Sequence, residues 1–415
     1  MKRLFFLIPI LFLSCQPTED SNILQQLISE NKKRLGAPAE NPEKFELQII
    51  YTQIDRDEKN IPSFTTHHFN VDENRYFYPA STVKMPTAFL ALEKINRLKK
   101  DGLDKYTELH IDSIRPPQTR LDTDSTAENG KASIAHFIKK IFLVSDNDAH
   151  NRMYEFLGQE YLNEELKKKG FSNTKIIHRI GPSGFPFDEE GNRHTNPFTF
   201  IGIIDTTHVY HQPEVYAENI QEMSPMELLR KGKGYISDGK LVNEPKDFSR
   251  KNRFALVDME GILRNVIFPE ATPEHQRFDL TEDDYQYLYK VMSMRPRESK
   301  FPKYTSHEYD SYVKFFIYGD KKEPIPDHIR IFNKVGWAYG YLSDVSYIVD
   351  LEKNVEFFLS AVISVNDNQI FNDDKYEYES IGLPFLANLG KVIYEYEVGR
   401  ERKQEPDLSK FKIKY

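Results

Sequence analysis

The sequence predicts a mixed α/β fold in which a sheet is assembled from both ends of the chain and a helical part is inserted between them. Strand-like runs occur near the beginning, at 45–51 and 64–71, and again near the end, at 345–349 and 355–365. The middle of the chain instead carries apolar residues at helical spacing. This order of elements predicts one sheet built from both terminal parts of the chain.

The N-terminal part begins with an expected amphipathic helix over 23–35, where apolar residues recur at helical spacing. The strand 45–51 follows. The polar turn 55–60 makes the run 64–71 its expected antiparallel partner. A shorter strand-like run, 75–78, leads into the helical part.

Two helices are predicted in the middle of the chain and a third at its end. The segment 84–98 is apolar over much of its girth, which indicates a helix inside a core. Ser133 is a favourable N-cap, and the apolar residues after it follow helical spacing: Ile134, Phe137, Ile138, Ile141 and Phe142. Near the end, 351–354 predicts a hairpin turn between the last two strands, and 385–396 predicts a final helix.

Composition narrows the class of protein. A chain of 415 residues is long enough for two or three domains, or for one large domain with insertions. Hydrophobic residues make up 39% and charged residues 29%, which is typical of a folded globular protein. A formal charge of −8 argues against a nucleic-acid binder that depends on a basic patch. Cys15 is the single cysteine, so neither an intrachain disulfide nor a cysteine-based zinc site can form.

The first residues predict export. Two basic residues precede an apolar run over 4–13, which is too short to span about 30 Å of hydrocarbon. Residues 1–14 are therefore interpreted as a signal peptide. The end of the run resembles a bacterial lipobox, which implies lipidation of Cys15 and a tether over 15–22. The expected product is a membrane-anchored lipoprotein facing the periplasm or the cell surface; the alternative is an ordinary signal peptide followed by an unmodified cysteine.

The first of three chemical motifs is Ser81-Thr82-Val83-Lys84, at the start of the apolar helix. A serine and a lysine one turn apart share a helix face, and a partly desolvated lysine can act as a base toward the hydroxyl. The same spacing of serine and lysine recurs elsewhere in the chain, at Ser29, Ser172, Ser237, Ser311 and Ser409. Ser81 differs from these because it opens the most apolar helix.

The other two motifs are ambiguous when each is taken alone. Ser145-Asp146-Asn147 occurs once and follows the helix capped by Ser133. Its serine and amide can pass a proton and hold a substrate amide, but such residues also cap helices. Lys334-Val335-Gly336 precedes the last two strands. Its lysine can meet a substrate carboxylate and its glycine permits close approach, whereas a solvated lysine at a strand start is the structural alternative.

Taken together, the three motifs resemble the SxxK, SDN and KTG elements of penicillin-recognising serine enzymes, most closely the class A β-lactamases. The resemblance extends over about 23–398. It implies a β-lactamase/transpeptidase-like fold, with an antiparallel sheet flanked by helices and an inserted helical domain. The sheet part would comprise 23–80 and about 304–415, and the helical part with the active site would comprise about 81–215.

The resemblance also implies a catalytic role for residues of the first two motifs. Ser81 would be the acylated nucleophile and Lys84 its proton acceptor. Ser145 would pass a proton to the leaving nitrogen. The oxyanion hole would consist of the backbone N–H of Ser81 and that of a residue near Trp337 or Ala338.

Substrate binding would fall to Asn147, which would bind an amide, and to Lys334, which would bind a carboxylate beside Gly336. Two residues depart from the family pattern here. Val335 stands where a hydroxyl residue is usual, so one hydrogen bond to a substrate carboxylate is missing. Trp337 stands where small residues would keep the cleft open.

The region between the second and third motifs departs further. It is longer than a class A enzyme needs, and the excess at about 216–303 is interpreted as an insertion that serves as a lid, a docking surface or a helical decoration. The family acid that hydrolyses the acyl-enzyme has no clear counterpart, because its expected position falls on Ile180-Gly181-Pro182. Asp188 and Glu189 are the nearest acidic candidates, with Asn192 four residues after Asp188; a solvated acidic turn is the alternative.

No cofactor and no metal are expected. The histidines that were considered as ligands lack suitable spacing with nearby acids: His67, His68, His150, His178 and His194.

Two classes of function are open at this point. One is a serine hydrolase that forms an acyl-enzyme on Ser81, either with β-lactams, which it hydrolyses slowly, or with peptidoglycan-like peptides, as DD-carboxypeptidases and transpeptidases do. The other is a non-catalytic lipoprotein that keeps the fold for binding. The presence of all three motifs favours the enzyme. Nucleic acid is not an expected partner, a membrane is expected only through the lipid anchor, and the sequence leaves the oligomeric state open.

Overall fold

The computed structural model describes residues 22–115, 119–181, 189–202, 208–219, 221, 223 and 229–415. Cys15, the predicted signal peptide and Asp188 lie outside these residues.

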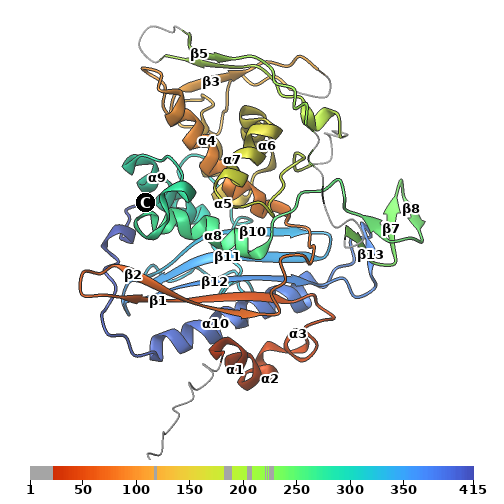
Figure 1. The fold of residues 1–415 in the computed structure, drawn as a ribbon, viewed down its shortest axis with the longest axis vertical. Helices are drawn as coiled ribbons and strands as arrows, with labels where there is room; N and C mark the ends of the chain where they lie inside the picture. Colours follow the sequence, from red (N-terminus) through yellow and green to blue (C-terminus); the bar gives the residue numbers. More distant parts are fainter. Residues whose placement is uncertain are drawn as a thin grey trace, which may run out of the picture.

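Within the described residues, the centre of the fold is a five-stranded antiparallel sheet in the order β10-β11-β12-β1-β2 (Figure 1). Its strands are β1 (Gln48–Arg56), β2 (Pro62–Phe69), β10 (Ile329–Ala338), β11 (Tyr341–Asp350) and β12 (Val355–Ser364). β1 pairs with β12, placing Gln48 opposite Val362. The prediction of one sheet built from both ends of the chain is therefore confirmed, and β10 is an edge strand.

Both faces of the sheet are buried. Along β1, Ile49 and Tyr51 face one hydrophobic core, while Ile50 and Ile54 face the other. The helices that cover the faces are α1 (Ile23–Glu30) and α10 (Leu383–Gly399) on one side, and α8 (Leu256–Ile267) and α9 (Glu282–Ser293) on the other (Figure 1). Burying a large apolar side chain contributes about 1.5–3 kcal/mol, so the two cores hold the sheet between its helical layers.

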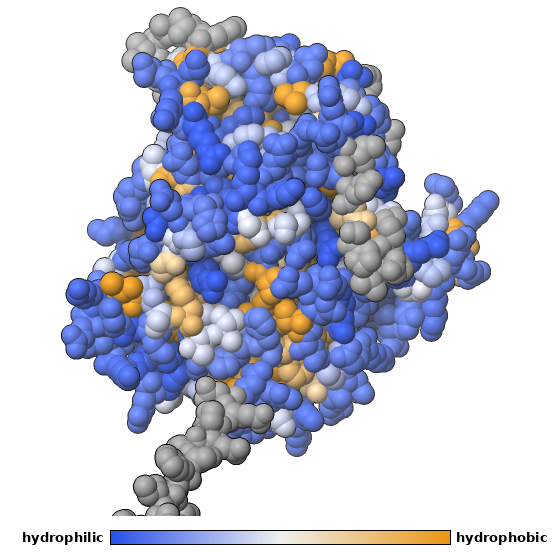
Figure 2. All heavy atoms as spheres, in the orientation of Figure 1, coloured by the Kyte–Doolittle hydropathy of each residue, from blue (hydrophilic) through white to orange (hydrophobic). Residues whose placement is uncertain are grey.

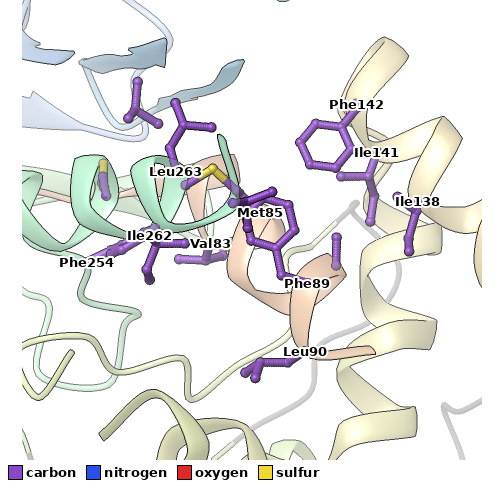
Figure 3. Close-up of a cluster of buried hydrophobic side chains, with 14 of the residues drawn as sticks. Val83, Met85, Phe89, Leu90, Ile138, Ile141, Phe142, Phe254, Ile262 and Leu263 are labelled. Atoms are coloured by element: carbon purple, nitrogen blue, oxygen red, sulfur yellow. The ribbon is translucent and has the colours of Figure 1, made fainter. Parts of the chain in front are cut away.

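The helical part stands on one side of the sheet and surrounds α4. Its helices are α4 (Lys84–Leu98), α5 (Ile134–Val144), α6 (Asn147–Leu157) and α7 (Gln159–Lys168). Figure 3 shows Met85 and Phe89 of α4 between Leu263 of α8 on one side and Phe142 of α5 on the other. This confirms the central position predicted for the apolar helix. Ser133 caps α5 as predicted, accepting a hydrogen bond from the His136 N–H at 3.2 Å.

Shorter elements complete the described fold. A three-stranded sheet caps the helical part, with strands β3 (Glu108–Ile111), β4 (Phe198–Ile201) and β5 (His208–Gln212). The remaining short helices are α2 (Lys32–Leu35), α3 (Ala37–Glu40), η1 (Ala80–Val83), η2 (Gly191–Arg193), η4 (Pro269–Ala271), η5 (Glu274–Gln276), η6 (Pro296–Glu298), η7 (Tyr378–Gly382) and η8 (Ser409–Phe411). None of the described helices combines the length and the apolarity that crossing a membrane requires.

Two local predictions were wrong. The run 75–78 is not a strand but an irregular segment. Tyr76, Phe77 and Tyr78 are all buried there, so their apolar character reflects core packing and not sheet pairing. The helix predicted over 23–35 is divided at Asn31, whose side chain donates to the Leu27 carbonyl at 2.9 Å.

The range 216–303 contains two different structures. Four short strands form an arm over 230–247: β6 (Arg230–Lys231), β7 (Gly234–Ser237), β8 (Lys240–Val242) and β9 (Lys246–Asp247). β7 also pairs with β13 (Ile370–Phe371). The β7–β8 hairpin of this arm projects from the body, and its visible surface is mainly hydrophilic (Figure 1 and Figure 2), whereas Lys231 at its base binds Glu46 at 2.6 Å. By contrast, α8 and α9 belong to the layer that covers the sheet.

Candidate active site

Ser81 lies in the short 3-10 helix η1, which precedes α4. The residue before it, Ala80, has φ of 47°, a left-handed conformation that costs energy for a residue other than glycine. Pro86 has no N–H and cannot bond the Thr82 carbonyl, consistent with the chain becoming α-helical only from Lys84 onward. The strained turn presents Ser81 at the wall of a cleft.

Gly336 explains how close β10 comes to this turn. A Cβ atom at that position would lie 2.4 Å from the Pro79 carbonyl oxygen and 2.6 Å from the Ser343 hydroxyl. The missing side chain therefore lets the edge strand lie directly against η1. The neighbour at Gly336 is thus the chain's own turn, and the approach of a ligand to this glycine stays a prediction.

Lys84 points from α4 toward the second motif and is fully buried. Its ammonium donates to the Ser145 carbonyl, to Asn147 Oδ1 and, at 3.3 Å, to the Ser145 hydroxyl. Burial lowers the pKa of Lys84 well below its ordinary value; the charge of Lys334 lowers it further, and Asp146 opposes the shift. Both effects favour the neutral amine, the form that can accept a proton.

The second motif forms a sharp junction between α5 and α6. Ser145 adopts a left-handed conformation, with φ of 59°, at the C-terminus of α5. Asp146 caps α6 by accepting a hydrogen bond from the Ala149 N–H at 2.8 Å. Capping therefore accounts for Asp146 alone. Asn147 uses its amide differently, accepting from Lys84 and donating to the Gly181 carbonyl at 3.1 Å.

Lys334 reaches the same junction from β10. Its ammonium donates to the Ser145 hydroxyl at 2.8 Å and to the Val335 carbonyl at 3.0 Å. The pKa of Lys334 is lowered to about 7, and burial is the main cause. The charge of Lys314 adds to this shift, and the carboxylate of Asp344 opposes it. The Ser145 hydroxyl thus lies between two buried lysines. Lys334 is no solvated strand-start residue, so that alternative is wrong.

The hairpin after β10 decides which backbone N–H faces the cleft. Tyr339 and Gly340 both have positive φ, 54° and 78°, as a two-residue type I′ turn requires. Ala338 and Tyr341, which flank the turn, then form a hydrogen-bonded pair. Along an antiparallel ladder, every second residue bonds the partner strand. Ala338 bonds β11, so its neighbour Trp337 directs its N–H and carbonyl to the free edge of β10. The geometry favours Trp337 over Ala338 as the oxyanion donor.

The motifs meet beside a cavity of about 820 Å³. Ser81, Asn147 and Trp337 line it, while Lys84 and Lys334 lie behind this lining. The side chain of Val335 is buried in the core on the opposite face of the sheet.

Another side of the cleft is lined by 177–181 and by Glu189, Asn192 and Arg193, while 182–188 lie outside the described residues. Arg179 forms a buried ion pair with Glu155 at 3.0 Å. Asn151 fixes Ile180 by two hydrogen bonds, accepting from its N–H at 2.9 Å and donating to its carbonyl at 3.0 Å. No motif in the sequence indicated these contacts, because they join residues more than twenty positions apart.

Of the two acidic candidates, Asp188 and Glu189, only Glu189 lies among the described residues. Glu189 lines the cleft, but its carboxylate binds Arg250 at 2.6 Å, and its side chain is 46% exposed. Asn192 is buried, and its side-chain oxygen accepts the Arg179 N–H at 2.9 Å. Of the position expected for the family acid, Ile180-Gly181-Pro182, the structure describes Ile180 and Gly181; a Cβ atom at Gly181 would meet nothing within 4 Å among the described residues.

Residues 37–396 match the model of a family described as the β-lactamase enzyme family. The chain belongs to the β-lactamase enzyme family. A search of curated proteins found no match. Solved structures with a similar fold include a β-lactamase from Sphaerobacter thermophilus, at 10% identity, 91% coverage of this chain and 98% of the other, with a TM-score of 0.48. Another is a β-lactamase from Xanthomonas campestris, at 13% identity, 90% and 97% coverage, and a TM-score of 0.47.

PBP-A is also similar, at 12% identity over 91% of this chain and 96% of the other, with a TM-score of 0.47. A mutant of PBP-A is described as an acyl-enzyme complex with penicillin G.

This β-lactamase family member also carries a buried imidazole that is influenced by the charge of Lys84. His150 is completely buried on α6, and neither ring nitrogen has a hydrogen-bond partner among the described residues. Burial lowers its pKa far below the ordinary value, and the charge of Lys84 lowers it further. Across the described residues, no three His, Cys, Asp or Glu side chains are gathered so as to hold a metal ion.

Proposed function

We propose that this protein is a serine hydrolase that forms an acyl-enzyme on Ser81 with β-lactam amides and hydrolyses it slowly. The observation that carries the proposal is the Ser145 hydroxyl held between Lys84 and Lys334, at the junction beside Ser81. Such an arrangement connects the proton lost by a nucleophile with the proton gained by a leaving group.

Acylation begins with transfer of the Ser81 hydroxyl proton to the neutral amine of Lys84. The freed oxygen attacks the β-lactam carbonyl carbon, and the negative oxygen that develops accepts hydrogen bonds from the N–H groups of Ser81 and Trp337. The C–N bond then breaks. Ser145 gives its proton to the leaving nitrogen and recovers one from Lys84, which returns to the neutral form.

Two further residues hold the substrate during this step. The Asn147 amide binds the substrate amide, and the Lys334 ammonium attracts the substrate carboxylate while holding the Ser145 hydroxyl in place. Hydrolysis of the ester needs a base that positions a water. The expected position of that base, Ile180-Gly181-Pro182, carries no carboxylate, which supports slow turnover; Asp188 and Glu189 remain the acidic candidates.

A peptidoglycan peptidase is the second candidate function. Val335 removes a hydroxyl expected near the β-lactam carboxylate, and the cleft has a large exposed Trp337 beside the reacting serine. The missing hydroxyl weakens binding of a β-lactam carboxylate, and the bulk of Trp337 narrows the cleft, so both features favour a substrate other than a simple β-lactam. Such a peptidase would use the same acylation step and pass the acyl group to water or to an amine.

Labelling with a fluorescent penicillin tests acylation. The wild-type protein should become labelled and Ser81→Ala should not. Ser172→Ala and Ser237→Ala are matched controls, because each removes a serine that is followed by a lysine at the same spacing, and both should be labelled normally. Absence of label in the wild type would support a non-catalytic binding protein, and label mapped to Ser172 or Ser237 would overturn the assignment of Ser81.

We also propose that the protein is exported and anchored through a lipid on Cys15. The support is the position of the single cysteine directly after the short apolar run. Cys15→Ala, or globomycin treatment, should prevent formation of the lipid-anchored form. If the Cys15→Ala protein still fractionates with membranes through a lipid, the proposal is wrong.

A further inference from the structure

A buried polar network lies beside the lysine of the third motif. It consists of Lys314, Asn333 and Asp344, each at most 2% exposed. Asn333 precedes Lys334 on β10, and side chains alternate along a strand, so the two point to opposite faces of the sheet. Asp344 of β11 shares the face of Asn333, because it pairs with Val335. Asn333 and Asp344 therefore lie across the sheet from the Lys334 ammonium.

Lys314 ties the free edge of β10 to the helical layer. Its ammonium donates to the Ile331 carbonyl at 2.8 Å, to the Asn333 side-chain oxygen at 2.9 Å and to the Met292 carbonyl of α9 at 3.0 Å. These three bonds use all the donors of an ammonium, which favours the charged form. Burial lowers the pKa of Lys314 to about 7, and the carboxylate of Asp344 opposes this shift.

The carboxylate of Asp344 is surrounded by donors. One oxygen accepts from the Asn333 amide at 2.9 Å and from the Ser346 hydroxyl at 2.8 Å. The other accepts from the Phe315 N–H at 2.9 Å and from the Phe316 N–H at 3.3 Å. Burial raises the pKa of Asp344, whereas these four hydrogen bonds lower it. Four donors match a carboxylate that only accepts, so the geometry favours the anion.

The two charges of the network act on Lys334 in opposite directions. The Asp344 carboxylate stabilises the Lys334 ammonium and raises its pKa, whereas the charge of Lys314 lowers it. Burial makes both effects strong, because salt and water screen buried charges far less than exposed ones. The balance between them therefore contributes to the charge of the lysine that holds the Ser145 hydroxyl at 2.8 Å.

Other titratable groups face Lys334 from the cleft side of the sheet. The pKa of Lys84 on α4 is lowered by the charge of Lys334 and raised by Asp146. His150 on α6 also responds to the charge of Lys334, and burial keeps this imidazole neutral. Neither side chain is an anion. Among the described groups that act on Lys334, Asp344 is the one that favours its ammonium.

We propose that Asp344 and Lys314 are positioning residues for the Ser81 site: through Asn333 they fix the edge of β10, and across the sheet their opposite charges balance that of the Lys334 ammonium. This inference rests on the proposed function, because it concerns the residue that holds Ser145 and attracts the substrate carboxylate. It adds two residues that line no part of the cleft.

The pH dependence of acylation by penicillin tests the inference in the full-length protein. Asp344→Asn keeps the shape of the side chain and removes its charge, so the Lys334 ammonium should be lost at a lower pH. The alkaline fall in acylation should then move down by about one pH unit, a tenfold change in the ratio of ammonium to amine. Lys314→Met removes the opposite charge and should move the fall up by a similar amount. Shifts in the same direction, or no shift in either variant, would overturn the inference.

Two control variants distinguish charge from packing. Lys314→Arg keeps the positive charge and should keep the wild-type profile; a shift as large as that of Lys314→Met would contradict the inference. Glu356→Gln removes another carboxylate of the same sheet, which is 1% exposed and paired with Arg56 at 2.6 Å, and it should leave the fall in place. Thermal melts check folding, and if Asp344→Asn does not fold, the two Lys314 variants test the inference by themselves.

An NMR titration of labelled lysine side chains separates this inference from the proposed function. The Lys334 signal is assigned by its loss in Lys334→Arg, and its midpoint should move down in Asp344→Asn and up in Lys314→Met. Opposite shifts in a protein whose Ser81 is never labelled by penicillin would overturn the proposed function and support the network. A labelled Ser81 together with a Lys334 midpoint that neither variant moves would overturn the inference alone.

Discussion

The two sides of the cleft differ in the chemical groups that they carry. On one side, η1, the α5–α6 junction and β10 bring Ser81, Lys84, Ser145 and Lys334 together, with both lysines buried and bonded to Ser145. On the other side, the described residues are held by backbone and ion-pair contacts, and Ile180-Gly181-Pro182 stands where an acid is expected. This difference separates the two halves of the proposed reaction, because acylation and hydrolysis depend on different sides.

The largest effect should come from Lys84. Lys84→Ala should slow acylation by penicillin about 10²- to 10⁴-fold, the usual contribution of a general base. The rate is measured by stopped-flow or gel labelling. Lys175→Ala is the control, since Lys175 follows Ser172 at the same spacing, and it should acylate normally. A normal rate in Lys84→Ala would show that the buried lysine is structural.

The next effect should come from the substrate-binding groups on the same side. Asn147→Ala and Lys334→Ala should each slow acylation about ten- to a thousandfold, because each loses a polar contact that is preorganised in the cleft. Thermal melts should stay close to those of the wild type. A large loss of stability with normal acylation would instead favour purely structural roles for both residues.

A gain of function should follow from changing the other side. Gly181→Glu should speed hydrolysis of the acyl-enzyme about tenfold or more by supplying a base. Among the residues that the structure describes, a Cβ atom at Gly181 meets nothing within 4 Å. Gly399→Glu is the control, because that glycine is equally unobstructed and lies at the end of α10. No change in hydrolysis with Gly181→Glu would mean that the missing acid does not limit turnover.

The smallest effect concerns pH. The pKa of Lys334 is lowered to about 7 by burial, so its ammonium is lost as the pH rises through that value. Acylation by an anionic penicillin should therefore fall severalfold from slightly acidic to slightly alkaline pH. Lys334→Arg should remove the fall, because a guanidinium stays protonated. An identical fall in Lys334→Arg would assign it to another group.

The sequence predicted those elements of the fold that are determined by residues close together in the chain. The apolar periodicity of α4, the Ser133 cap and the hairpin between β11 and β12 were all correct, because period and capping act within a few residues. The grouping of the three motifs at one site is what the family resemblance implied, and the structure brings them together.

Contacts between distant segments could not be predicted in this way. The Glu155–Arg179 pair and the approach of Tyr378 to Trp337 depend on how loops are folded over the sheet. The choice of Trp337 over Ala338 required the two-residue turn after β10, which the sequence analysis did not identify. The prediction of a strand at 75–78 was wrong because a run of buried aromatic residues has the sequence pattern of a strand even where it pairs with no other strand.

The central claim is that the site acylates readily but lacks an effective base for hydrolysis. Its most direct test is a time course of intact-protein mass spectrometry after mixing with penicillin G. The account predicts that one penicilloyl adduct forms on Ser81 and persists long after mixing, and that Ser81→Ala forms none. Rapid return to the unmodified mass, with accumulation of hydrolysed penicillin, would contradict it; loss of that turnover in Asp188→Ala or Glu189→Ala would then identify the base.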